Sequence, residues 1–162
     1  MPALLRARAV QTPEAAAFAV EETPGRWRTV NWRAFFDQAQ AVSGRLRRAG
    51  VRRGTRLAII APVGLEWEIV HHAALAAGAA VLGLDAHDQP QRLREMLDQA
   101  GVDALAVADP SLLECASPAC RARLKAVLHW GAAAPDADTW PMAWTLREWM
   151  QPDAASVGCD GK

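Results

Sequence analysis

The sequence predicts an α/β fold: a mostly parallel, doubly wound sheet with helices on both faces, and an N-terminal antiparallel hairpin. Leu57–Ala61 is apolar without interruption, which is typical of a strand covered on both faces. Residues 62–64 end that strand and open a helix, Leu65–Ala77, that has apolar side chains on every side. Gly78 stands where a left-handed cap ends a helix, and Val81–Leu84 is the next apolar run. Strand, helix and strand in this order form a βαβ unit, which requires parallel strands.

The N-terminal residues predict a short helix and a hairpin. Ala3–Val10 has the composition of a short amphipathic helix, and a Thr-Pro-Glu turn at Pro13 follows it. Ala16–Val20 and Arg26–Val30 flank a Pro-Gly turn, so we expect them to pair as antiparallel strands.

A long amphipathic helix is predicted over Trp32–Arg48. Asn31 precedes it as a suitable N-cap, and Gly50 ends it. Its apolar positions have the spacing of one helix face and comprise Trp32, Phe35, Ala39, Val42, Leu46 and Ala49.

Downstream of the βαβ unit, helices and strands continue to alternate. Asp88 is expected to cap a helix that has a proline in its first turn and ends at Gly101. Its core face comprises Leu93, Met96, Leu97 and Ala100. Ala104–Ala108 reads as a short buried strand, and Ser111–Arg123 as one or two short helices broken near Pro118.

The C-terminal part is less regular. Ala126–Trp130 is a last short apolar strand, and beyond Gly131 the composition shifts to Ala, Pro and Asp. Trp144–Met150 predicts one or two further helical turns. We therefore assign residues 1–150 to one α/β unit and residues 151–162 to a linker or truncated end.

Composition narrows the class of protein. With 51% hydrophobic and 22% charged residues, the chain is globular, and 18 basic residues balance 18 acidic ones, so nucleic acid is not an expected partner. The longest uncharged run, Ile69–Leu84, is shorter than the ~20 apolar residues that span a bilayer. No secretory leader is visible, and the 3 cysteines have no framework spacing, so we expect reduced thiols and a cytoplasmic location.

Several groups of residues invite a functional interpretation, and each has a plainer one. The neighbours His71 and His72 point to different helix faces, whereas a metal pair needs a spacing of three or four, so packed histidines are favoured over ligands. His87, in a loop after a strand, is a weak site candidate. A basic cluster is better explained by cations at a helix C-terminus than by phosphate binding; it comprises Arg45, Arg47, Arg48, Arg52, Arg53 and Arg56.

No catalytic, cofactor-binding or metal-binding residue is nominated. Cys115 and Cys120 lack the further ligands of a zinc site and are expected to be plain thiols. The turn Ala61–Gly64 occupies the phosphate-binding position of doubly wound folds but contains neither a dinucleotide fingerprint nor a phosphate loop. The serines lack the flanking residues of a nucleophile elbow; they are Ser43, Ser111, Ser117 and Ser156.

A family resemblance rests on three stretches in a fixed order. They read LLRARAVQTPEAAAFAV, then RTVNWRAFFDQAQAVSGRLRRAGVRRGTRLAII, then APVGLEWEIVHHAALAAGAAVLGLD. Together they resemble the N-terminal region of the acyl-adenylate-forming (AMP-binding) ligases, and fatty acyl-CoA synthetases in particular, from Leu4 to about Trp149. The chain departs from the family's usual Asp, Asn and Pro at Thr55, Val63 and Gly83.

The resemblance implies an enzyme that activates a carboxylate with ATP and magnesium and transfers the acyl group to coenzyme A. It also implies that this chain is only a scaffold part of that enzyme, because the family's phosphate loop ending Pro-Lys-Gly does not occur in it. Without that loop we expect the chain alone to be inactive.

Two other interpretations remain open: a stand-alone α/β binding or interaction module, and a flavodoxin-like nucleotide binder. If the chain is a fragment, its partner is the missing remainder of the ligase, and an exposed apolar surface favours self-association. The candidates for that surface are Trp140, Met142, Trp144 and Trp149.

Overall fold

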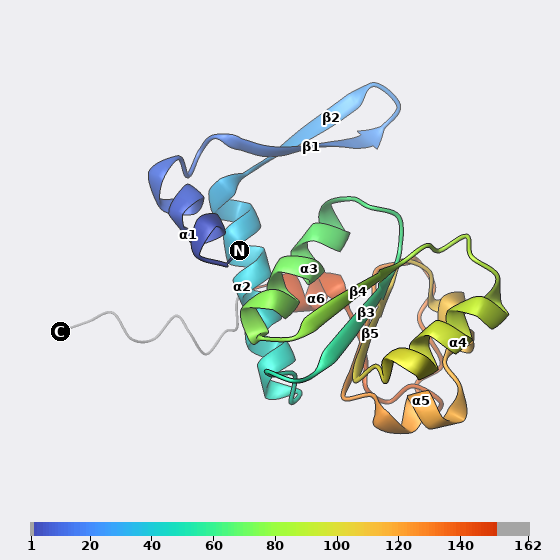
Figure 1. The fold of residues 1–162 in the computed structure, drawn as a ribbon. Helices are drawn as coiled ribbons and strands as arrows, with labels where there is room; N and C mark the ends of the chain where they lie inside the picture. Colours follow the sequence, from blue (N-terminus) through green and yellow to red (C-terminus); the bar gives the residue numbers. More distant parts are fainter. Residues whose placement is uncertain (1, 152–162) are drawn as a thin grey trace.

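A five-stranded, wholly parallel sheet forms the centre of the chain in the computed structural model, which describes residues 2–151 (Figure 1). Its strands are β3 (Arg56–Ile60), β4 (Ala80–Leu84), β5 (Ala104–Val107), β6 (Ala126–His129) and β7 (Ala143–Thr145). They lie in the order β4-β3-β5-β6-β7, which is the 2-1-3-4-5 order of flavodoxin-like doubly wound sheets. The predicted fold class is confirmed.

Helices cover both faces of the sheet. One face is packed against α2 (Trp32–Arg48), α3 (Leu65–Ala77) and α6 (Leu146–Met150), and the other against α4 (Pro90–Ala100), the 3-10 helix η1 (Pro110–Cys115) and α5 (Pro118–Arg123). Leu57 and Ile59 of β3 belong to the first core, whereas Ala58 and Ile60 belong to the second. All four side chains are buried, which explains why this strand is apolar without alternation.

The N-terminal part lies beside this sandwich. After α1 (Pro2–Gln11), strands β1 (Ala16–Thr23) and β2 (Arg26–Asn31) pair antiparallel and extend away from the sheet (Figure 1). Asn31 caps α2, since its Oδ1 accepts a hydrogen bond from the Ala34 amide at 2.8 Å. No helix within residues 2–151 combines the length and the apolar character needed to cross a membrane.

Two sequence predictions need correction, and one strand was missed. The residue at the N-cap of α4 is Gln89, while Asp88 instead pairs with Arg92 at 3.4 Å. Strand β7 was not predicted. Trp140 and Trp149, expected on an exposed surface, are each only 4% exposed, because Trp140 packs into the core on one face of the sheet and Trp149, on α6, packs into the core on the other.

The other predictions for the C-terminal part, from Met142 onwards, are confirmed in part. Met142 is partly buried, and Trp144 alone of the four candidates is exposed, at 48%. The predicted helical turns before Met150 are present as α6. The predicted linker lies, apart from Gln151, outside the described residues.

Candidate functional site

The carboxyl ends of β3 and β5 form the point where a doubly wound sheet binds its ligands. The chain passes from β3 to β4 on one side and from β5 to β6 on the other, so the connections diverge between these neighbouring strands. The turn of residues 61–64 lies here, beside Ala108, whose amide donates to the Ile60 carbonyl at 3.1 Å.

The first turn of α3, which follows residues 61–64, is acidic. Gly64 is the N-cap of α3 without a side-chain bond, and Glu66 and Glu68 lie in the first helical turn. Their carboxylates already complement the positive end of the helix dipole and repel a phosphate. Lys125, the one lysine among residues 2–151, lies just before β6 at the opposite edge, 3.4 Å from an oxygen of Asp103. The described residues of this turn therefore do not fit the phosphates of a nucleotide.

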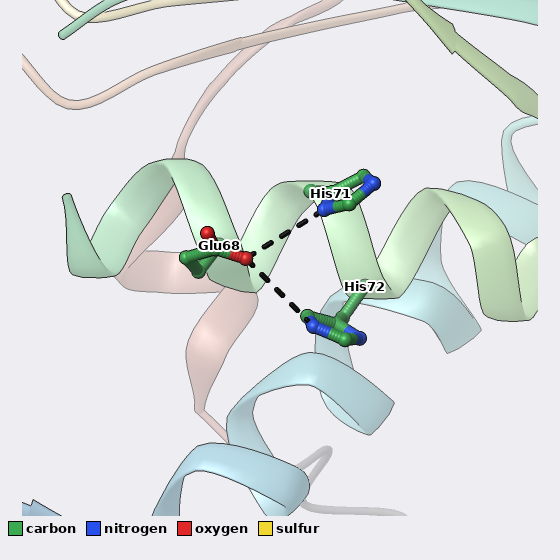
Figure 2. Close-up of side chains that lie close together, drawn as sticks. All are labelled: Glu68, His71 and His72. Carbon is green, nitrogen blue, oxygen red and sulfur yellow. Dashed lines mark ion pairs between the residues drawn. The ribbon is translucent and has the colours of Figure 1, made fainter. Parts of the chain in front are cut away.

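A cluster of three possible metal ligands lies further along the same helix. Figure 2 shows the Glu68 carboxylate facing the two imidazoles of His71 and His72, all on α3. Glu68 Oε2 is 3.6 Å from His71 Nδ1 and 3.7 Å from His72 Nε2. One ligand atom from each residue lies within 4.8 Å of the other two.

Aromatic neighbours fix the two imidazoles. The Trp67 ring lies 4.8 Å from the His71 ring, and the Phe35 ring of α2 meets the His72 ring edge-on at 5.4 Å. The side chains of Glu68, His71 and His72 are 28%, 23% and 17% exposed, so the cluster is shielded and still reachable from solvent. Burial, followed by the neighbouring His71, lowers the pKa of His72, and Glu68 opposes this shift. At neutral pH this favours the uncharged imidazole.

The sequence prediction for these histidines was incomplete. His71 and His72 do pack into the protein, as predicted. The one-residue spacing between the two histidines does not favour a metal pair, but Glu68 stands three residues before His71 and four before His72. Both spacings bring side chains together on a helix. The sequence motif Glu-x-x-His-His therefore indicates that the three side chains lie close together.

Three arginines of the basic cluster bond to carbonyls at helix ends. Arg47 donates to the carbonyl of Ala76 at the end of α3, and Arg56 donates to the carbonyl of Ala100 at the end of α4, at 2.6 Å. Arg45 reaches the Gln151 carbonyl at 3.4 Å. Carbonyls at helix C-termini lack intrahelical partners, so these guanidinium groups satisfy them. These arginines therefore lie at helix C-termini, as predicted, but the carbonyls that they bind belong to neighbouring helices.

The other candidates lie apart from one another. His87 is exposed after β4, with Nδ1 3.1 Å from Asp85 Oδ1. Its backbone and side-chain hydrogen bonds lower the pKa of Asp85. Cys115 and Cys120 are buried free thiols whose pKa is raised by burial, so they are poor nucleophiles. His129, at the carboxyl end of β6, is also buried.

The serines serve the fold. Ser117 caps α5, accepting from the Cys120 amide at 3.0 Å while its hydroxyl donates to Asp98 at 2.7 Å. The Ser111 amide donates to Asp109 at the start of η1. Ser43 is buried in α2. Ser156 lies outside the described residues.

Comparison with known proteins identifies the family. Residues 5–156 match the family described as AMP-binding enzyme. The chain belongs to the AMP-binding enzyme family. It is 32% identical over 112 residues to enterobactin synthase component F of Shigella flexneri and of Escherichia coli. That alignment covers 69% of this chain and 8% of the relative.

Solved structures named as acyl-CoA ligases have the same fold. Acetoacetyl-CoA synthetase from Streptomyces lividans superposes with a TM-score of 0.80 at 20% identity, covering 93% of this chain and 24% of that one. A putative long-chain-fatty-acid CoA ligase from Rhodopseudomonas palustris gives 0.74 at 16% identity, covering 94% and 36%. The chain thus spans 8% of the length of the curated relative, and 24% and 36% of the two solved structures.

Two departures from the family's usual residues have local structural roles. Thr55 is buried, and its hydroxyl donates to the Arg52 carbonyl at 2.6 Å, closing the turn that leads into β3. At Gly83 of β4, an added Cβ would lie 3.2 Å from Cζ2 of Trp67. The missing side chain therefore makes room for the indole that packs against His71. Val63 is exposed in the turn before α3.

Proposed function

We propose that this chain is the N-terminal scaffold of an ATP-dependent, AMP-forming acyl-CoA ligase, and that it does not catalyse adenylation by itself. The parent enzyme would join a carboxylate to the α-phosphate of ATP, releasing pyrophosphate. It would then transfer the acyl group to the thiol of coenzyme A, releasing AMP. ATP, magnesium and coenzyme A are therefore requirements of the parent enzyme.

The family match over residues 5–156 is the observation that carries this proposal. Two solved structures with this fold are named as a synthetase and a ligase of coenzyme A thioesters, which supports coenzyme A as the acceptor. The proposed inactivity follows from charge. Glu66 and Glu68 stand at the start of α3, and Pro-Lys-Gly does not occur in the sequence. Phosphoryl chemistry needs cations around the developing negative charge.

The test is ATP–pyrophosphate exchange over a panel of short, long and aromatic carboxylic acids. We expect no exchange from the 162-residue chain, and acid-dependent exchange from the protein encoded when the reading frame past Lys162 is included. In the longer protein, thioester formation is then compared between coenzyme A and a pantetheinylated carrier protein. Exchange by the short chain would contradict its inactivity, and preference for the carrier protein would contradict the acceptor.

A stand-alone binding or interaction module is the second candidate. The burial of Trp140 and Trp149 favours it, because the described part of the chain closes its own core there. Light scattering after size exclusion distinguishes the two. A fragment is expected to self-associate through apolar surface such as Trp144, whereas a stand-alone module is expected to be a monomer. Trp144→Ser should reduce that association if the surface is responsible.

A further inference from the structure

We infer that Glu68, His71 and His72 form a binding site for one divalent transition-metal ion, with zinc as the natural test ion. Two imidazole nitrogens and one carboxylate oxygen are the donor set of zinc, nickel and copper sites, whereas magnesium and calcium require oxygen ligands. This inference is independent of the adenylation chemistry.

The distances within the cluster suit a bridging ion better than hydrogen bonds. Oxygen–nitrogen separations of 3.6 and 3.7 Å exceed those of ordinary hydrogen bonds. Tetrahedral zinc with bonds of about 2.0–2.1 Å holds its ligand atoms about 3.4 Å apart. To bind an ion, the carboxylate oxygen therefore needs to shift by only a few tenths of an ångström. The two imidazole nitrogens, which lie no more than 4.8 Å apart, need to move closer together.

The cluster also contains a polar atom that an ion would satisfy. His71 Nδ1 is buried and has no hydrogen-bond partner within the described residues, although it faces the Glu68 carboxylate. Leaving a buried polar atom unpaired costs free energy, and a metal bond would remove that cost.

Helical spacing makes the site a chelate. Glu68 and His71 are three residues apart, Glu68 and His72 are four apart, and both pairs share one carboxylate. The i, i+3 Glu–His pair is a known metal-binding arrangement on helices. Trp67 and Phe35 already hold the imidazoles, so little side-chain freedom is lost on binding. With three protein ligands, a fourth position is left to water.

The experiment titrates zinc into the untagged chain by calorimetry. The unchanged chain and every variant carry Cys159→Ser, so that this thiol does not compete for zinc. We expect one zinc per chain and a raised melting temperature, since the ion binds only the folded helix. Glu68→Gln and His71→Asn should each weaken binding roughly tenfold or more. His87→Asn, which removes an exposed imidazole beside Asp85, is the matched control and should leave binding unchanged.

A second measurement counts nitrogen ligands. Electron paramagnetic resonance of the copper-loaded chain should show two coordinated imidazole nitrogens, and His71→Asn should leave one. Circular dichroism confirms that each variant is folded, and His72→Asn replaces His71→Asn if the latter is not. Absence of zinc binding at millimolar concentration, or equal affinity in Glu68→Gln and the unchanged chain, would overturn the inference. Binding abolished by His87→Asn would do so as well.

Discussion

Replacing Gly78 by alanine should destabilise the protein more than replacing Gly54. Both glycines have left-handed backbones, with φ of 93° and 90°. An added Cβ at Gly54 would meet nothing within 4 Å, whereas at Gly78 it would lie 3.1 Å from the Arg53 amide nitrogen and 3.5 Å from its Cα. The pair therefore separates backbone strain from steric crowding.

The magnitudes follow from these two differences. A left-handed L-residue costs about 1–2 kcal/mol, which is the whole effect expected for Gly54→Ala. At Gly78 the obstacle is backbone, which cannot rotate away as a side chain does. Overpacking of this kind adds roughly 1–3 kcal/mol, so we expect a total of about 2–5 kcal/mol for Gly78→Ala. Native domains have about 5–15 kcal/mol of stability, so Gly54→Ala should remain folded, whereas Gly78→Ala should lose a large share of its stability.

Equilibrium unfolding in urea measures both variants against the unchanged chain. The slope of free energy against urea should stay the same, so that the midpoints report stability alone. Equal losses for the two variants would refute the argument, because they would mean that the α3–β4 connection relaxes away from Arg53 without cost.

Two further predictions concern the carboxyl end of β6 and the start of α6. Burial lowers the pKa of His129 from 6.5, so the folded chain binds that proton at lower pH than the unfolded chain. The contribution of His129 to the free energy of unfolding should be fully present above pH 6.5 and should be lost as the pH falls from there towards the folded-state pKa. In urea unfolding at a series of pH values, His129→Asn should flatten this part of the profile. An unchanged profile would contradict the prediction. Thr145→Ala should lower the free energy of unfolding by about 1 kcal/mol in urea, because Thr145 and Glu148 form a capping box at the start of α6. Glu148→Gln is the control, since glutamine can still complete the box. Equal losses for the two variants would contradict this reason.

The sequence predicted the elements whose ends are chemically marked. Helix α2 begins after the Asn31 cap, and α3 runs from Gly64 to the left-handed Gly78, so both helices have the predicted bounds. Strand β7 was missed because it has three residues, none fully buried, in an Ala- and Pro-rich stretch. Its strand state depends on pairing with β6, which no local pattern shows.

The candidate site was less predictable because it depends on a third residue and on neighbouring elements. The two histidines are adjacent in sequence, and their shared partner lies one helical turn earlier. The packing that fixes their rings comes from Phe35, on another helix, and from Trp67, which has room only because residue 83 is glycine. These contacts join α2, α3 and β4, and a single sequence does not reveal them.

The ligand-binding edge of the sheet and the Glu68–His71–His72 cluster have opposite electrostatic requirements. The proposed adenylation and the proposed metal binding can therefore be tested separately. An ATP-binding edge needs positive charge, yet the first turn of α3 presents Glu66 and Glu68. If the parent enzyme binds ATP at this edge, as doubly wound sheets bind ligands, the cations must come from residues outside 2–151. The metal cluster instead requires Glu68 to be negative and takes all three of its ligands from α3. Glu68→Gln should therefore weaken zinc binding by the short chain, whereas the adenylation proposed for the parent enzyme should depend chiefly on residues that this variant leaves in place.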